Sequence, residues 1–305
     1  MARILPTLLV LGLLGCTAAA FAVTEGLKLE KSPIFRTAVD KVIAPDSDAH
    51  ATAGIGFKLR KPDRVTVEIV NGSGTVVRVL TRNQPRRAGA QSFIWDGRAD
   101  SGGVVPDGYY RPRVHLARER RTIVLPNPIR MDATPPLIKL VSVRPRVFSP
   151  DGDFRFDRVR IQYRTNEPAR AILYVDGEPH APVFRFVRKG KLDWGGKAAR
   201  RLRPGPHRLR LRGLDRATNL GPPSRALTVF VRYIEVRPHS LRVKTGARFC
   251  FRVLTDAKRY TVHLGPLHAS RSGRLLVLRA PAPGTYVLRV AANGHVARAR
   301  VVVVP

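Results

Sequence analysis

Aspartates placed one residue apart are the side chains of this sequence whose type and spacing best fit ion chemistry. Asp151 and Asp153 lie in the segment SPDGDFRFD, which ends at Asp157, and Asp46 and Asp48 repeat the spacing. Carboxylate oxygens at this spacing suit Ca²⁺, although the glycine and bidentate glutamate of an EF-hand loop are missing. Aspartates that cap turns explain the same residues. Asp151, Asp153 and Asp157 are therefore a candidate calcium site, weighed against a turn-forming role, and no other metal or cofactor is expected.

Catalytic motifs are absent from the sequence. The 305 residues contain no His-Glu-x-x-His, no Gly-x-Ser-x-Gly and no phosphate-binding loop, and the eight histidines are scattered singly. The two cysteines, Cys16 and Cys250, cannot form a disulfide framework. Cys250 lies in the alternating stretch ARFCFRV, where we expect a half-buried thiol on the same face as Arg248 and Arg252. The sequence predicts a protein that is not an enzyme.

Positive charge is spread over the whole chain. The formal net charge is +33, and residues 233–305 alone carry +11. A surface this cationic favours anionic partners. The sequence shows no recognition helix and no basic sheet studded with aromatic residues, which argues against nucleic acid. We expect anionic cell-wall polymers, lipid headgroups or other envelope proteins as partners.

An apolar run over residues 4–23 opens the chain, and three interpretations compete for it. A cleaved signal peptide would use the small residues Ala20 and Ala22, and a lipoprotein signal would use Cys16. An uncleaved anchor fits the run's length, since about 20 residues cross a bilayer as a helix. The run continues through Phe21 and Val23, which favours the anchor. In every case residues 24–305 are expected outside the cytoplasm of a bacterium, with 1–23 as signal or anchor and 24–40 as a linker.

Strict alternation of apolar and polar residues recurs along the rest of the chain, as in RVTVEIV and RLRLR, and it predicts an all-β fold. Two segments, starting near residues 42 and 147, share the same order of Pro-Asp loop, alternating strand, turn and second alternating strand. Such a repeat indicates tandem modules. We expect β-sandwiches over 41–131, 132–232 and 233–305, with DATPP at 132–136 as a stiff linker.

The stretch WDGRADSGGVVPDGYY, residues 95–110, resembles the Ig-like domain of flagellar hook-capping proteins. Trp95 ends an alternating strand and is expected to fill the core between two sheets. Asp96-Gly97 and Asp107-Gly108 supply turn residues, and Tyr110 points inward on the closing strand. KLDWGG, with Trp194, is the counterpart in the second module, where Gly195 replaces the aspartate. The third module matches no motif beyond its PGTY ending.

These observations lead to one expected function and two alternatives. We expect a non-enzymatic scaffold or adhesion protein, tethered to a bacterial membrane with most of the chain outside the cytoplasm. The resemblance allows a flagellar hook assembly factor instead. An accessory module of a cell-wall enzyme is a further alternative, and it requires a catalytic partner chain.

Overall fold

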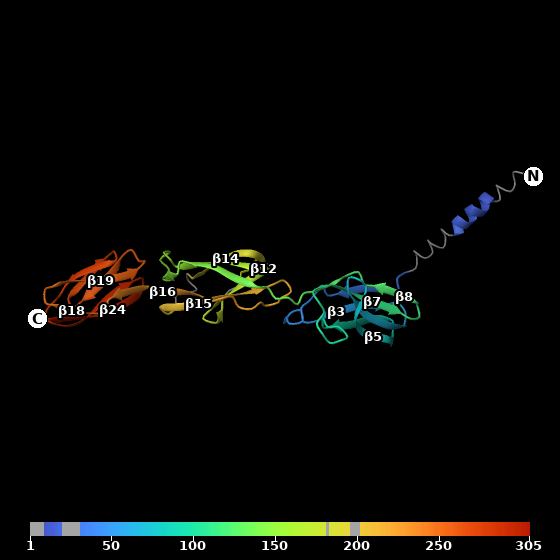
Figure 1. Cartoon of the computed structure of the whole chain (residues 1–305), viewed down its shortest axis with the longest axis horizontal. Coiled ribbons are helices and arrows are strands. Elements are labelled where there is room, and N and C mark those ends of the chain that lie inside the picture. The colour runs from blue at the N-terminus through green and yellow to red at the C-terminus, as the bar shows by residue number, and fades with distance from the viewer. Residues whose placement is uncertain (1–8, 20–30, 181–182, 196–201) are drawn as a thin grey trace, which may run out of the picture. The chain divides into compact units, whose positions relative to one another are not determined.

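The computed structural model describes residues 9–19, 31–180, 183–195 and 202–305 (Figure 1). Residues 9–19 are helical, and the elements after them are strands. The other parts of the predicted anchor, 1–8 and 20–23, lie outside the described residues. Within the described part, no helix combines the length and the apolar character that crossing a membrane requires.

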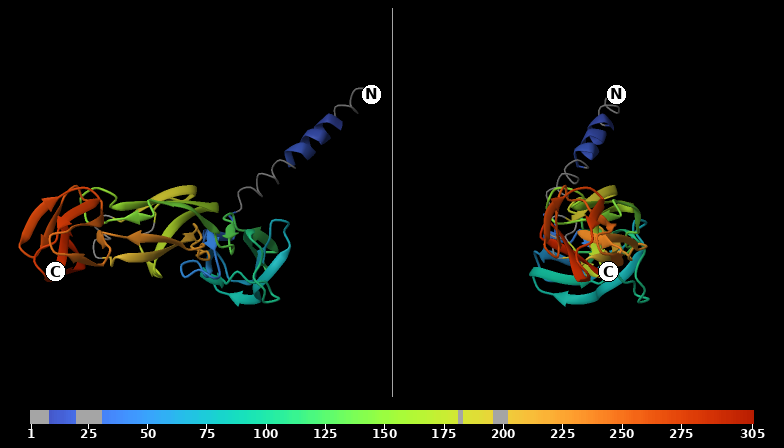
Figure 2. Two further views of the ribbon diagram at one scale, coloured as in Figure 1. Left: turned by 60° about the vertical axis from the view of Figure 1, so that its left-hand side comes forward. Right: turned by 90° about the vertical axis from the view of Figure 1, so that its left-hand side faces the viewer.

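The chain folds into β-sandwiches, so the all-β prediction is confirmed. Two compact units divide it, Met1–Ala133 and Thr134–Pro305. The first unit holds one hydrophobic core and the second holds two. We name the sandwiches around these cores the first, second and third sandwich, built by β1–β9, β10–β16 and β17–β24. Figure 2 shows their strands from two further directions, in blue to green, green to orange and orange to red.

The first sandwich packs a sheet of order β1-β3-β6 against a sheet of order β2-β9-β7-β4-β5, with β8 beside β7. The bounds of its strands are β1 (Ile34–Val39), β2 (Val42–Ile43), β3 (Ala53–Leu59), β4 (Asp63–Val70), β5 (Val76–Arg86), β6 (Gly89–Trp95), β7 (Gly108–Leu116), β8 (Arg121–Val124) and β9 (Ile129–Met131). Apolar side chains alternate along these strands because each sheet buries only one face. On β7 the prediction holds: Tyr110, Val114 and Leu116 are buried while Tyr109 and His115 are exposed.

The predicted linker over 24–40 is wrong for residues 34–39, which form β1. This strand pairs antiparallel with β3, and its Ile34 belongs to the first core. The strand escapes the alternation pattern because it has a register shift between Phe35 and Ala38, with Arg36 at a φ of +51°. Residues 24–30 lie outside the part of the chain that the structure describes.

The second sandwich is built around one long strand, β12, which takes part in both sheets. Its first half pairs with β10 and β14, and its second half pairs with β13 and β15. The turn expected between the two alternating strands of the second repeat does not form, because the chain continues through Pro168 as strand, with a register shift between Arg164 and Ala169. The bounds are β10 (Ile138–Arg144), β11 (Val147–Phe148), β12 (Arg158–Val175), β13 (Glu178–Pro179), β14 (Val187–Gly195), β15 (Gly205–Leu214) and β16 (Leu227–Val231).

The third sandwich pairs a sheet of order β17-β19-β22 with one of order β18-β24-β23-β20-β21. Its strands are β17 (Ile234–Arg237), β18 (Ser240–Lys244), β19 (Arg248–Thr255), β20 (Tyr260–Leu264), β21 (Leu267–Arg271), β22 (Leu275–Arg279), β23 (Gly284–Ala292) and β24 (His295–Val304). This strand order repeats that of the first sandwich position by position. The third sandwich is therefore the same fold, although its sequence carries little of the motif.

One feature of chain path recurs in all three sandwiches. The first strand of each belongs to one sheet, and the short strand that follows crosses to the other sheet. There β2, β11 and β18 pair in parallel with β9, β16 and β24, the last strands of their sandwiches. The switch ties the beginning of each module to its end.

Candidate functional site

The tryptophan of the motif is part of the frame of the first sandwich. Trp95 has no exposed surface, and its ring lies 5.3 Å from that of Tyr110. Its indole N–H donates to the carbonyl oxygen of Arg98 at 3.0 Å. The burial of the Trp95 ring and the hydrogen bond of its N–H stabilise the packing of the end of β6 on β7.

The two Asp-Gly pairs shape the backbone around this ring. Asp96 accepts a hydrogen bond from the Arg98 N–H at 3.1 Å, and Gly97 follows at a φ of +73°. A Cβ on Gly97 would lie 2.9 Å from Pro45 Cγ, so only glycine fits. Asp107 accepts from the Ala133 N–H at 2.7 Å, which ties the end of the first unit to this corner.

The side chain of Tyr110 is hydrogen-bonded to the backbone four residues earlier in the chain. Tyr110 donates its hydroxyl to the carbonyl oxygen of Pro106 at 2.8 Å, close to the start of β7 at Gly108. This is the tyrosine corner of Ig-like sandwiches. Burial, then the nearby Asp107 charge, raises the pKa of Tyr110, so the hydroxyl stays a donor. The residues of the motif thus serve architecture.

The same corner occurs in the other two sandwiches. Tyr286 donates to the carbonyl oxygen of Ala282 at 2.9 Å. In the second sandwich His207 takes this place, with Nε2 2.9 Å from the carbonyl oxygen of Arg203. Trp194 lies nearby as the counterpart of Trp95, buried and 5.2 Å from the ring of Phe148. The glycine after Gly195 in KLDWGG lies outside the described residues.

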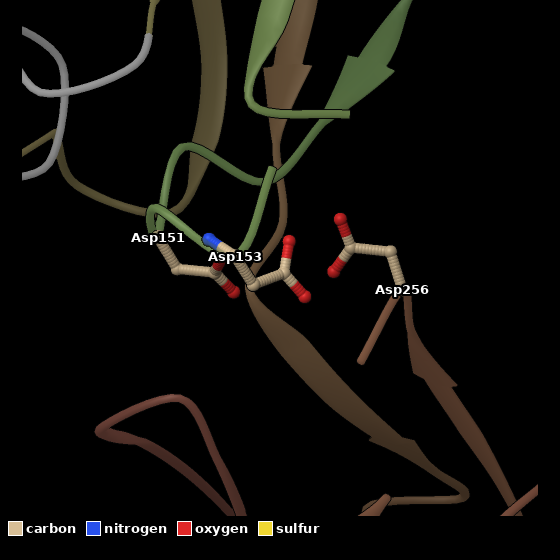
Figure 3. Close-up of side chains that lie close together, drawn as sticks. All are labelled: Asp151, Asp153 and Asp256. Carbon is tan, nitrogen blue, oxygen red and sulfur yellow. Dashed lines mark hydrogen bonds between the residues drawn. The ribbon is translucent and has the colours of Figure 1, made fainter. Parts of the chain in front are cut away.

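A group of three carboxylates is the candidate ion site of the second unit. Asp151, Asp153 and Asp256 each place an oxygen within 4.8 Å of the others. Figure 3 shows the two loop aspartates on one side and Asp256, which follows β19, on the other. All three are partly buried. Oxygen ligands in this arrangement could hold a hard cation such as Ca²⁺.

The predicted site includes Asp157, but this residue lies outside the group of three carboxylates. Its carboxylate accepts from the N–H groups of Gly152 and Phe154, both at 2.7 Å, and so caps the loop. Asp46 and Asp48 belong to no such carboxylate group among the described residues. Asp256 was not foreseen, because it lies about a hundred positions away in another sandwich and no local spacing points to it.

The side-chain amide of Asn293 takes up two of the carboxylate oxygens of this group. Its Nδ2 donates to Asp151 Oδ2 at 3.1 Å and to Asp153 Oδ2 at 3.0 Å. Burial, followed by the charges of Asp151 and Asp153, raises the pKa of Asp256 to about 6. A hollow of about 440 Å³ adjoins Asp256 and is also lined by cationic side chains of Arg155, Lys258 and Arg274. Asp151 and Asp153 of the second sandwich are thus hydrogen-bonded to Asn293 of the third sandwich.

Cys250 differs from the expectation in burial. It is exposed, not half-buried, and lies on the outer face of β19 with Arg248 and Arg252, as predicted. Within the described residues both cysteines are free.

Comparison with known proteins matches the first sandwich. The model of the FlgD Ig-like domain family covers residues 42–119. Basal-body rod modification protein FlgD of Salmonella typhimurium, and that of Salmonella typhi, are each 38% identical over 68 residues, which is 22% of this chain. The chain spans 29% of the length of these curated relatives. The resemblance drawn from the motif is confirmed for this module.

Solved structures give weaker overall superpositions. FlgD from P. aeruginosa is 26% identical, with 31% of this chain and 73% of that chain covered, at a TM-score of 0.24. A bacterial ice-binding adhesin is 11% identical, with 89% and 97% covered, at a TM-score of 0.31. The strand pairing described above, rather than these scores, establishes the fold.

Proposed function

We propose that this chain, whose residues 42–119 form an FlgD-type Ig-like domain, is a non-enzymatic assembly scaffold of the flagellar hook kind that works outside the cytoplasm. The observation that carries the proposal is the family match together with the use of its motif. Trp95, Gly97 and Tyr110 all serve to hold the sandwich together. Because the distinctive residues of this module hold its fold together, we assign its function to the surface that the fold presents to other proteins.

A membrane tether is part of the proposal. The helix over 9–19 belongs to the apolar run 4–23, which is long enough to anchor the chain. Two further sandwiches follow the matched module along the chain, and the proposal counts them as parts of the same scaffold.

A chimera tests the assembly role. The Ig-like segment of the Salmonella typhimurium relative is replaced by residues 42–119 of this chain, and the chimera is expressed in a strain that lacks the relative. We expect hooks in electron micrographs, and we expect none when the chimera also carries Trp95→Ala, since the sandwich then loses the largest side chain of its core. A stable, exported chimera that builds no hooks would contradict the proposal.

Envelope scaffolding or adhesion is the second candidate, because the second and third sandwiches lie outside the matched segment. Deletion of the gene in the bacterium that produces the protein separates the two functions. Loss of hooks supports the assembly role. Intact hooks with loss of surface attachment support adhesion.

A further inference from the structure

The five-stranded sheet of the third sandwich turns one face to solvent, and four nitrogen-rich side chains cross it in one row. Arg298 of β24 lies opposite Arg289 of β23. Arg289 lies opposite His263 of β20, which in turn lies opposite His268 of β21. All four are exposed. Neighbouring strands are about 4.8 Å apart, so this cationic row is about 14 Å long.

The face around the cationic row holds no carboxylate. Residues 233–305, all of them described, contain two acidic residues, Glu235 and Asp256. Glu235 lies on β17 of the other sheet and pairs with Arg237. Asp256 belongs to the group with Asp151 and Asp153. Arg300, two residues beyond Arg298 on the same face of β24, adds to the positive charge.

In the first sandwich, the arginine at the position equivalent to Arg289 is neutralised by a carboxylate of the same chain. Arg113 follows its corner tyrosine by three residues, as Arg289 follows Tyr286. The guanidinium of Arg113 binds the carboxylate of Glu68 on the neighbouring strand, with Nη2 2.7 Å and Nε 3.0 Å from Oε2. In the third sandwich His263 stands where Glu68 stands in the first. Among the described residues, no carboxylate pairs with Arg289.

The rest of the face indicates what kind of anion would fit. The rings of His263 and His268 stack 3.9 Å apart, so they cover each other's inner faces and leave their nitrogen-bearing edges uncovered by the stack. The aromatic residues Tyr260 and Tyr286 point into the core side of the sheet, so neither tyrosine offers the outer face a platform for stacked bases. Exposed Val287 and Val296 flank the row and could contact uncharged parts of a polymer.

We propose that the cationic row binds a single-chain phosphodiester polymer of the glycerol-phosphate type, lying across β24, β23, β20 and β21. Arginine guanidinium groups bind phosphate oxygens in pairs, and Arg289 and Arg298 supply two of them in one line with the two histidines. The proposal goes beyond the scaffold function and does not depend on it, because it rests on a different sandwich.

Fluorescence anisotropy with a labelled glycerol-phosphate polymer tests the proposal on the full-length chain in non-ionic detergent. We expect Arg289→Gln with Arg298→Gln to weaken binding at least tenfold at low salt. The matched control removes the same charge from the opposite sheet, with Arg248→Gln and Arg252→Gln on β19, and should change binding less than threefold. Equal losses in both variants would show diffuse attraction and overturn the site.

His263→Glu is the second variant. It puts a carboxylate opposite Arg289, as Glu68 lies opposite Arg113, and should reduce binding as strongly as the double variant while the sandwich keeps its thermal transition. Neutral dextran should not bind. Unchanged binding by His263→Glu, equal binding of polyglutamate, or tighter binding of duplex DNA would each overturn the proposal.

Discussion

The Nε2 atom of His207 lies 2.9 Å from the carbonyl oxygen of Arg203, in the place where the other two sandwiches use a tyrosine hydroxyl. Its Nδ1 lies 2.6 Å from Asp176 Oδ2. Partial burial acts to raise the pKa of Asp176, but hydrogen bonds from the Arg208 N–H and from His207 outweigh it and hold the pKa below its usual value. The ring of His207 therefore bridges a carboxylate and a backbone carbonyl oxygen, whereas each corner tyrosine reaches the carbonyl oxygen alone.

Phenylalanine substitutions of Tyr110 and His207 should lower the free energy of unfolding in proportion to the number of hydrogen bonds that each one removes. Tyr110→Phe loses one hydroxyl bond and should lower the free energy of unfolding of the first sandwich by about 1 kcal/mol. His207→Phe should cost the second sandwich more, since it removes two contacts, one to Asp176 Oδ2 and one to the Arg203 carbonyl oxygen. Scanning calorimetry measures both, with the exposed Tyr109→Phe as the control. A smaller effect at His207 than at Tyr110 would contradict a stabilising role for the bridge between Asp176 and the Arg203 carbonyl.

Removal of the Trp95 side chain should destabilise only the first sandwich. Trp95→Ala leaves a large cavity between the two sheets, and the expected cost is about 3–5 kcal/mol. The chain has two tryptophans, so Trp194 then reports alone on the second sandwich. Its fluorescence transition in urea should stay where it is in the wild type. A shift of that transition would mean that the two sandwiches unfold together.

Gly97→Ala should be costlier than the same change at Gly74. Both glycines have positive φ, +73° and +83°, but a Cβ at Gly74 meets nothing within 4 Å. Gly74→Ala therefore carries only the backbone strain, about 1–2 kcal/mol. Gly97→Ala adds the clash with Pro45. Urea denaturation compares the two, and equal losses would show that the Pro45 contact relaxes freely.

Asp256→Asn should stabilise the chain at pH 7.5. The carboxyl has a folded pKa of about 6, above the unfolded value near 3.8, so folding favours its protonated form. The carboxylate therefore costs stability above pH 6, and this cost disappears as the pH falls through the range from about 6 to 4. The difference in melting temperature between variant and wild type should be positive at pH 7.5 and vanish near pH 4. A variant that melts lower at pH 7.5 would contradict this.

The amino terminus should keep the protein in membranes. If the apolar run 4–23 is an uncleaved anchor, the full-length chain sediments with membranes and resists extraction by high salt, because apolar insertion is not screened by ions. Mass spectrometry of the purified chain identifies its first residue. A chain that begins at Val23 would show a cleaved signal, and one that begins at a lipid-modified Cys16 would show a lipoprotein.

Much of the first sandwich could be predicted from sequence, because its determinants are local. Alternation along β7 predicted which side chains turn inward, and Trp95, Gly97 and Tyr110 lie within one motif of 16 residues. The strand at 34–39 was missed since it is an edge strand with a bulge at Arg36 and only Ile34 fully buried. The third sandwich lacks most of the motif, yet its alternation was enough to predict strands.

The carboxylate group shows where such prediction ends. Asp151 and Asp153 could be identified from spacing, whereas Asp256 and Asn293 reach them only because two sandwiches meet. Asp157 was assigned to the wrong role, since spacing alone cannot tell a cap from a ligand. The cationic row has the same origin: its members come from four strands, and only the register of the sheet brings them into line.

The parallel pairing of each module's switched strand with its last strand has a mechanical consequence. Tension that pulls the two ends of a sandwich apart loads these parallel strands lengthwise, so the hydrogen bonds between them share the force instead of opening one after another. The contact joins five residue pairs between β18 and β24, against two between β2 and β9. The third sandwich has the longest of these parallel contacts, so we expect it to resist a lengthwise pull better than the first or the second.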